Sequence, residues 1–144
     1  MNFNHISNFG KKKRLKNQIK LIVFHYTGMQ SKVDAFKKLS SSKSKVSCHY
    51  FIDETGNVTK IVPEKFSAWH AGKSAWKNFK FLNKFSIGIE LVNPGHDFGY
   101  RKFSKKTNSF SKKNIKKINY QIQHNQFKYC RSFRYCPFEK KRSR

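Results

Sequence analysis

Two short runs of β-branched and aliphatic residues constrain the fold of this chain more than any other feature. The first run covers residues 18–27 and ends at a Thr-Gly pair, and the second covers residues 85–93 and ends at a Pro-Gly pair. Runs of this length and composition, bounded by turn residues, are typical of strands buried inside a sheet. We therefore expect both runs to lie in the core of one sheet.

The region between the two runs contains a helical pattern. Residues 31–39 place Val33, Phe36 and Leu39 on one helical face, and Ser31 is a good N-cap residue with an acidic residue three positions later. We expect a short helix that buries this face.

A hairpin pattern follows the predicted helix. Residues 46–53 and 58–62 have strand composition and are separated by a turn sequence at 54–57, which predicts a β-hairpin. Residues 63–84 hold both tryptophans and show no regular period, so we expect an irregular segment there.

Length and charge limit the class of protein. The chain has 144 residues, which suits one domain, and a formal net charge of +25. The basic excess lies mostly in residues 1–20 and 101–144, so a nucleic-acid-binding arm is one interpretation. We favour a composition bias toward Lys, Asn, Ile, Phe and Ser, because no recognisable nucleic-acid-binding fold accompanies the charge.

Other whole-chain features exclude some classes. Three cysteines without a metal-type spacing give no disulfide framework and favour a reducing compartment. No apolar run approaches the length of a transmembrane helix, and residues 1–20 lack the apolar core of a secretory signal. We expect a monomeric protein of the cytoplasm with no membrane span.

Two polar residues stand out in the predicted buried strands. His25 ends the first strand before a glycine turn, and Glu90 lies inside the second, otherwise apolar, strand. A charged side chain in such a strand is costly unless it has a partner or a catalytic task. Taken singly, a core histidine and an outward-facing glutamate are the simpler explanations.

A series of sequence blocks carries a family resemblance. In order, they are I-V-F-H-Y-T-G, V-S-C-H-Y-F-I, D-E-T-G-N-V, A-W-H-A-G-K-S-A-W and N-K-F-S-I-G-I-E, between residues 22 and 90. The chain resembles the zinc-dependent N-acetylmuramoyl-L-alanine amidases of type 2, which are bacterial peptidoglycan amidases related to phage amidase-lysozymes and peptidoglycan recognition proteins. The resemblance implies an α/β fold with a central mixed β-sheet and flanking helices.

The same resemblance implies roles for particular residues. His25 corresponds to a zinc ligand, and Glu90 corresponds to the residue that helps to activate water for attack on the amide between N-acetylmuramic acid and L-alanine. A neutral imidazole at a rigid strand end suits Zn²⁺, and a buried carboxylate with a raised pKa suits proton transfer. The resemblance also places Trp69, His70 and Asn83 in the cleft that binds peptidoglycan or muropeptide. It places His49 and Tyr26 beside this cleft or behind the zinc ligands.

The chain departs from the family after residue 100. Family members supply two more zinc ligands and a lysine from a segment of the form G-H-S-D-I-A-P-x-R-K-x-D-P-G, so only one ligand of three is present here. With permitted codons, residues 131–144 translated one nucleotide out of frame give G-H-S-D-I-A-P-L-K-K-K-D-P-G. We infer a frameshift near residues 111–114, which leaves the C-terminal part of the fold incomplete.

This inference divides the chain into a basic segment at 1–18, an incomplete amidase-like domain at 19–112 and a basic tail at 113–144 that is disordered or out of frame. We expect a peptidoglycan amidase by family whose activity in this chain is low or absent. The alternatives are an inactive muropeptide-binding module and, with less support, a basic nucleic-acid-binding protein.

Overall fold

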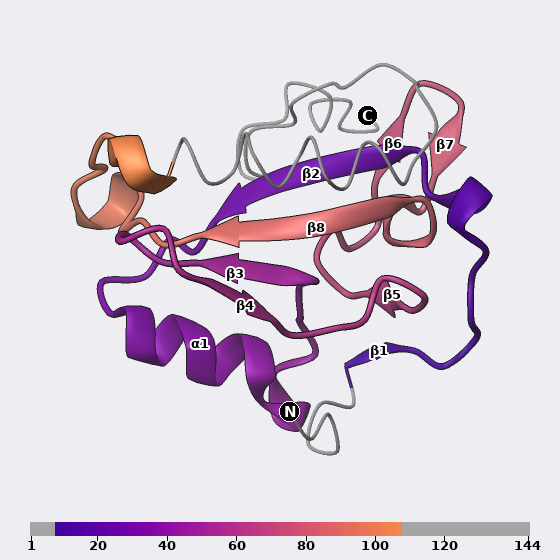
Figure 1. Cartoon of the computed structure of the whole chain (residues 1–144), viewed down its shortest axis with the longest axis horizontal. Coiled ribbons are helices and arrows are strands. Elements are labelled where there is room, and N and C mark those ends of the chain that lie inside the picture. The colour runs from indigo at the N-terminus through magenta and orange to yellow at the C-terminus, as the bar shows by residue number, and fades with distance from the viewer. Residues whose placement is uncertain (1–7, 108–144) are drawn as a thin grey trace, which may run out of the picture.

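The structure, a computed structural model, describes residues 8–107 and is built around a four-stranded sheet with the strand order β2-β8-β3-β4 (Figure 1). Strands β2, β8 and β3 are parallel, and β4 runs antiparallel to β3 as the second strand of the expected hairpin. The predicted mixed sheet is therefore confirmed. The strand bounds are Leu21–Tyr26 for β2, Tyr50–Ile52 for β3, Val58–Lys60 for β4 and Ser86–Leu91 for β8.

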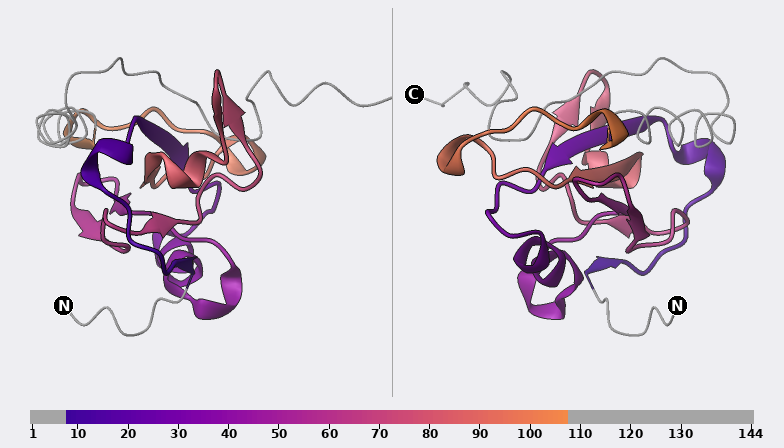
Figure 2. Two further views of the ribbon diagram at one scale, coloured as in Figure 1. Left: turned by 90° about the vertical axis from the view of Figure 1, so that its right-hand side faces the viewer. Right: turned by 60° about the vertical axis from the view of Figure 1, so that its left-hand side comes forward.

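Both apolar runs form adjacent strands of one sheet, as expected, but among the described strands only β8 lies in its interior, and β2 lies at its edge. One side of the sheet packs an aliphatic cluster that includes Ile22, Ile87 and Ile89, each at most 4% exposed. A second cluster of buried residues, with Cys48 and Phe51 among its members, includes Ala35 and Leu39 of α1 (Lys32–Ser40). Helix α1 lies against one face of the sheet (Figure 2). Residues buried on both faces explain the near-continuous apolar sequence of these strands.

Helix α1 begins where the sequence predicts, but it buries a different face. The Asp34 backbone N–H donates to Ser31 Oγ at 3.3 Å, which caps the helix. The buried residues are Ala35 and Leu39, whereas Val33 is 54% and Phe36 38% exposed, so the predicted face is wrong at both of these positions. Ala35 lies one turn before Leu39 on the same stripe, and its small side chain permits close approach to the sheet.

Short elements complete the described part of the chain. The segment expected to be irregular contains β5 (Ser67–Ala68), which pairs with β1 (Phe9–Gly10), and a small hairpin of β6 and β7. No helix among the described residues is long and apolar enough to cross a membrane. The remaining bounds are Ala75–Trp76 for β6, Phe79–Lys80 for β7, Lys16–Gln18 for the 3-10 helix η1, Ser42–Ser44 for η2, Leu82–Lys84 for η3 and His96–Phe98 for η4.

The basic N-terminal segment contacts the sheet through one buried arginine. Arg14 is 9% exposed and its Nε donates to the Glu64 carbonyl at 2.8 Å. Its Nη1 donates to the Ser86 carbonyl at 2.8 Å, and also to the carbonyls of Asn83 and Lys84. One planar guanidinium with several donors thereby hydrogen bonds to the first carbonyl of β8, to two carbonyls just before this strand and to one in the segment after β4.

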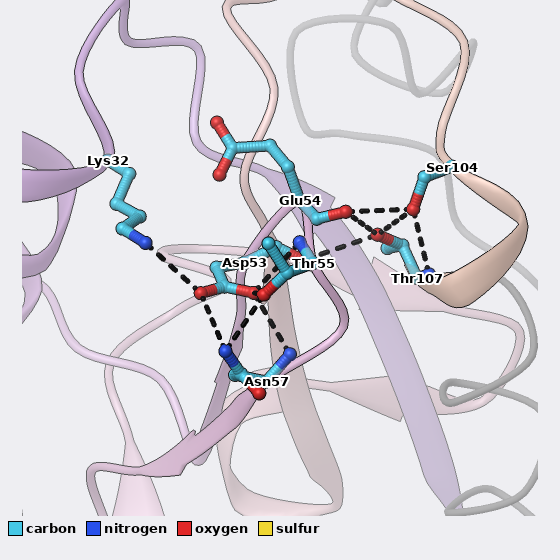
Figure 3. Close-up of polar contacts among 7 residues, drawn as sticks. All are labelled: Lys32, Asp53, Glu54, Thr55, Asn57, Ser104 and Thr107. Carbon is cyan, nitrogen blue, oxygen red and sulfur yellow. Dashed lines mark hydrogen bonds and ion pairs between the residues drawn. The ribbon is translucent and has the colours of Figure 1, made fainter.

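The β3–β4 turn is held by the Asp53 carboxylate (Figure 3). Its Oδ1 accepts from the backbone N–H groups of Thr55 at 3.0 Å and Asn57 at 2.9 Å, and its Oδ2 lies 3.2 Å from Lys32 Nζ on α1. Thr107 is almost completely buried, and its hydroxyl donates to the Asp53 carbonyl at 3.2 Å. One turn therefore joins the hairpin, the start of α1 and the last described residues.

These contacts give Asp53 a pH-dependent role in stability. Burial raises the pKa of Asp53, but hydrogen bonds from Thr55, Asn57 and Lys32 outweigh that effect and lower it to about 2. Because the folded pKa is below the unfolded value, the contribution is present above about pH 4 and is lost as the pH falls toward 2.

We predict that Asp53→Asn lowers the free energy of unfolding by about 1–2 kcal/mol at pH 7. The difference from the wild type should shrink between about pH 4 and pH 2, as followed by urea unfolding with tryptophan fluorescence. Glu54→Gln is the matched control, because the contacts drawn for Glu54 in Figure 3 use its backbone carbonyl and its carboxylate points away from the network. A constant difference across that pH range would contradict the assignment.

Candidate active site

The structure brings together the two polar residues singled out in the buried strands. His25 and Glu90 are register partners on the adjacent parallel strands β2 and β8, near their carboxyl ends. Opposed residues of neighbouring strands project to the same face of a sheet, so the imidazole and the carboxylate share one side. Ligand sites commonly form at the carboxyl ends of parallel strands.

Glu90 is a carboxylic acid with an unsatisfied buried oxygen. Its Oε2 is inaccessible to solvent and has no hydrogen-bond partner within the described part of the chain. Burial raises the pKa of Glu90 to about 8, and the nearby positive charge of Lys38 opposes that rise. A buried polar atom without a partner is costly, which favours a functional role for this oxygen.

A cavity of about 170 Å³ lies beside this carboxylate. Its lining includes Trp69, His70 and Glu90, together with Lys38 and Leu39 from α1. Trp69 is 39% exposed, so an indole face is available to a ligand at the cavity. Two of the predicted cleft residues, Trp69 and His70, are thus placed next to Glu90.

His25 is hydrogen bonded to a second histidine. Its Nε2 lies 2.9 Å from His70 Nδ1, and His70 Nε2 lies 3.1 Å from Ser86 Oγ. Burial lowers the pKa of His25 to about 4 and lowers that of His70 well below its usual range, with the charge of His25 a lesser cause. Both rings are therefore neutral near pH 7.

His49 is completely buried behind this pair. Its Nδ1 accepts from the Gly88 backbone N–H at 2.9 Å, and its Nε2 lies 3.0 Å from the Phe66 carbonyl. Burial, and then the charge of Arg14, lowers the pKa of His49 to about 3. The side chain connects β8 to the segment before β5 and its ring centroid is 5.8 Å from that of His70.

Two other predicted site residues contact protein groups rather than the cavity. Asn83 Oδ1 accepts from the backbone N–H of His70 at 3.2 Å and of Ala71 at 2.8 Å. Tyr26 follows His25 in β2, so it projects to the opposite face of the sheet, and its ring contacts that of Tyr100. Their roles in substrate binding remain predictions.

Metal ligation is only partly accounted for by the described residues. His25 supplies a neutral imidazole, and the unsatisfied Glu90 oxygen lies on the same face of the sheet. Within residues 8–107 no group of three His, Cys, Asp or Glu side chains is placed to hold a metal ion. The predicted out-of-frame ligand segment at 131–144 lies outside the described residues.

Sequence analysis missed the contribution of Gly88. A Cβ added at this position would lie 2.3 Å from His70 Cγ, so the ring of His70 occupies the space that a side chain would need. The S-I-G-I-E block contains this glycine, but its sequence alone gives no indication of which ring lies against it.

We predict that Gly88→Ala displaces His70 and lowers the free energy of unfolding by about 1–3 kcal/mol. Gly10→Ala is the matched control, because a Cβ there would be 3.5 Å from its nearest neighbour, an ordinary contact. Urea unfolding of both variants measures the difference. Equal stabilities for the two variants would show that the close packing of His70 on β8 is not maintained in solution.

The raised pKa of Glu90 predicts that its ionised carboxylate lowers the free energy of unfolding. Because the folded pKa exceeds the unfolded value, the stability gained from protonation is complete below about pH 4 and is lost as the pH rises through 8. In chelator-treated protein, Glu90→Gln should therefore unfold with a free energy about 1–3 kcal/mol higher than the wild type at pH 8. Calorimetric scans at pH 4 and pH 8 test this, and an advantage that does not grow with pH would be evidence against it.

Comparison with known proteins places this chain and its fold in a family. Residues 15–134 match the model of the family described as N-acetylmuramoyl-L-alanine amidase. The match covers most of the chain, and the chain therefore belongs to this family. The family assignment and the type 2 amidase fold agree with the resemblance drawn from the sequence blocks.

Individual relatives support the assignment. The N-acetylmuramoyl-L-alanine amidase AmiD of Escherichia coli is 40% identical over 86 residues, which cover 54% of this chain and 30% of AmiD. The 1,6-anhydro-N-acetylmuramyl-L-alanine amidase AmpD of Citrobacter freundii is 45% identical over 47 residues, which cover 33% of this chain and 25% of AmpD. The matched part thus spans under a third of these relatives.

Solved structures show the same architecture over more of the chain. The complex of E. coli AmiD with anhydro-N-acetylmuramic acid-L-Ala-D-γ-Glu-L-Lys aligns with a TM-score of 0.63 and 31% identity, covering 74% of this chain and 46% of AmiD. The complex of Pseudomonas aeruginosa AmpDh3 with anhydromuramic pentapeptide aligns with a TM-score of 0.67 and 25% identity, covering 85% of this chain and 52% of that one.

Proposed function

We propose that this site hydrolyses the amide bond between N-acetylmuramic acid and L-alanine of the peptidoglycan stem. The observation that carries the proposal is the buried, unpartnered Oε2 of Glu90 on the same face of the sheet as His25. Family membership supplies the reaction class, and the substrate class is supported by the muropeptide complexes of the two similar amidases.

Glu90 is suited to move a proton in this reaction. Its ionised oxygen would accept a proton from the attacking water, and the resulting acid would deliver that proton to the leaving amine of L-alanine. A carboxyl with a pKa raised by burial can hold the proton between these two events. The adjoining cavity, with Trp69 at its exposed side, would hold the sugar-peptide substrate against this carboxyl.

We also propose that His25 is a zinc ligand of this site. Its neutral imidazole at the end of β2 has the chemistry that Zn²⁺ requires, and a catalytic zinc needs further ligands that residues 8–107 do not supply. Bound zinc would polarise the scissile carbonyl. The expectation of low activity in this chain follows from the ligands that the sequence analysis found missing.

Cleavage of a defined muropeptide by the full chain tests the proposal. Purified protein with added Zn²⁺ is incubated with anhydro-N-acetylmuramyl peptide, and the released peptide is quantified by mass spectrometry. Because only one zinc ligand of three is present, we expect slow peptide release, which falls at least about 100-fold further in Glu90→Gln, the usual effect of removing a general acid-base. Glu54→Gln, at an exposed glutamate, should leave the rate unchanged.

A binding measurement on the same preparation distinguishes the second function. Muropeptide binding without peptide release would favour the inactive binding module, for which the incomplete metal donor set among residues 8–107 is the supporting observation. A protein that shows neither muropeptide binding nor peptide release would overturn both functions. Salt-sensitive DNA binding in that case would support the nucleic-acid alternative.

A further inference from the structure

We propose that Ser86 and His70 form a hydrogen-bonded relay that sets the tautomer of His25, protonating its Nε2 and leaving Nδ1 as the electron-pair donor. The relay makes His70 a positioning residue, in addition to its predicted place in the substrate cleft. The hydrogen-bond argument does not depend on the proposed function. Only the purpose of the relay, to offer one defined nitrogen of His25 to a metal ion, rests on that function.

The direction of the relay begins at the Ser86 hydroxyl. Ser86 Oγ lies 2.6 Å from the Leu82 carbonyl oxygen and 3.1 Å from His70 Nε2. A carbonyl oxygen can only accept, and a hydroxyl has a single proton to donate. The Ser86 proton therefore goes to Leu82, and Ser86 Oγ is left to accept a proton from His70 Nε2.

The direction then passes from His70 to His25. A neutral imidazole carries one ring proton, so His70 with a proton on Nε2 has an unprotonated Nδ1. That Nδ1 lies 2.9 Å from His25 Nε2, a distance that requires one donor and one acceptor. His25 Nε2 must therefore carry the proton, and in the neutral ring Nδ1 carries none.

The scaffold around His70 holds the relay in this geometry. Asn83 Oδ1 accepts from the backbone N–H groups of His70 and Ala71, which fixes the segment that carries the ring. Gly88 leaves room for the ring directly against β8. Ser86 is completely buried, so bulk water does not compete for its hydroxyl.

A fixed tautomer matters because metal ligation by histidine depends on which nitrogen is unprotonated. The hydrogen bond made by one ring nitrogen selects the other as ligand, and partners of this kind typically change metal affinity or activity about 10–100-fold when removed. His70 and Ser86 would have this role without touching the reacting atoms.

The test measures the tautomer directly, without any metal or activity. The full chain is labelled with ¹⁵N-histidine and treated with chelator, and long-range ¹H–¹⁵N spectra are recorded at pH 7.5. We expect His25 to show a protonated, pyrrole-like Nε2 and an unprotonated, pyridine-like Nδ1. His25→Gln identifies the signal. The reverse pattern in the wild type would overturn the proposal.

Ser86→Ala removes the acceptor for His70 Nε2 and should shift His25 toward the Nδ1-protonated tautomer. Ser47→Ala is the matched control, because Ser47 is an equally buried serine whose hydroxyl donates to the Asn8 carbonyl and accepts from the Trp69 backbone N–H, and neither group belongs to the relay. An unchanged His25 tautomer in a folded Ser86→Ala variant would overturn the role of Ser86. If that variant does not fold, the wild-type spectrum alone decides.

This outcome is separable from that of the proposed function. Absence of peptide release with the expected wild-type tautomer would remove the amidase and keep the relay. Peptide release with the reverse tautomer would keep the amidase and remove the relay.

Discussion

The central position of β8 is the constraint on which the site depends. Ser86, Gly88 and Glu90 alternate along this strand and therefore project to one face, while Ile87 and Ile89 project to the other and are buried in an apolar cluster. A shift of the strand by one residue would exchange the two sets, placing isoleucines at the site and a carboxylate in the core. The apolar face thereby specifies the position of the polar one, and His25 reaches Glu90 only because β2 pairs with β8 in parallel and in this register.

Much of this arrangement could be predicted from the sequence because its signals are local. The composition of the two buried strands, the turn between the hairpin strands and the Ser31 cap each arise within a few residues, and the family blocks relate His25 to Glu90. The buried stripe of α1 was less predictable, since Ala35 has too small a side chain to mark a hydrophobic face in the sequence. Arg14 carries no local signal at all: it ends a run of basic residues, and only its contacts with distant carbonyls distinguish it from the lysines before it.

The roles of the residues within the site could not be predicted from the sequence, because they too depend on contacts between distant parts of the chain. Nothing in the A-W-H-A-G block indicates that His70 Nδ1 meets His25 or that its ring lies on Gly88, because both contacts span many residues of chain. The cost of the unpartnered Glu90 oxygen is also a property of its surroundings, in which burial outweighs the opposing positive charge of Lys38 on α1. The residue types indicate that a site exists, but only packing determines which groups donate or accept hydrogen bonds and which leave room for a neighbouring side chain.

The attachment of Thr107 to the β3–β4 turn has a topological consequence. Its hydroxyl bonds to the carbonyls of Asp53 and Glu54, so the described chain ends against the hairpin and not against β2. Strand β3 lies two places from β2 in the sheet, and each interstrand step is about 4.8 Å. The last described residue is thus held roughly 10 Å across the sheet from the strand that carries His25, by a threonine that takes no part in the chemistry.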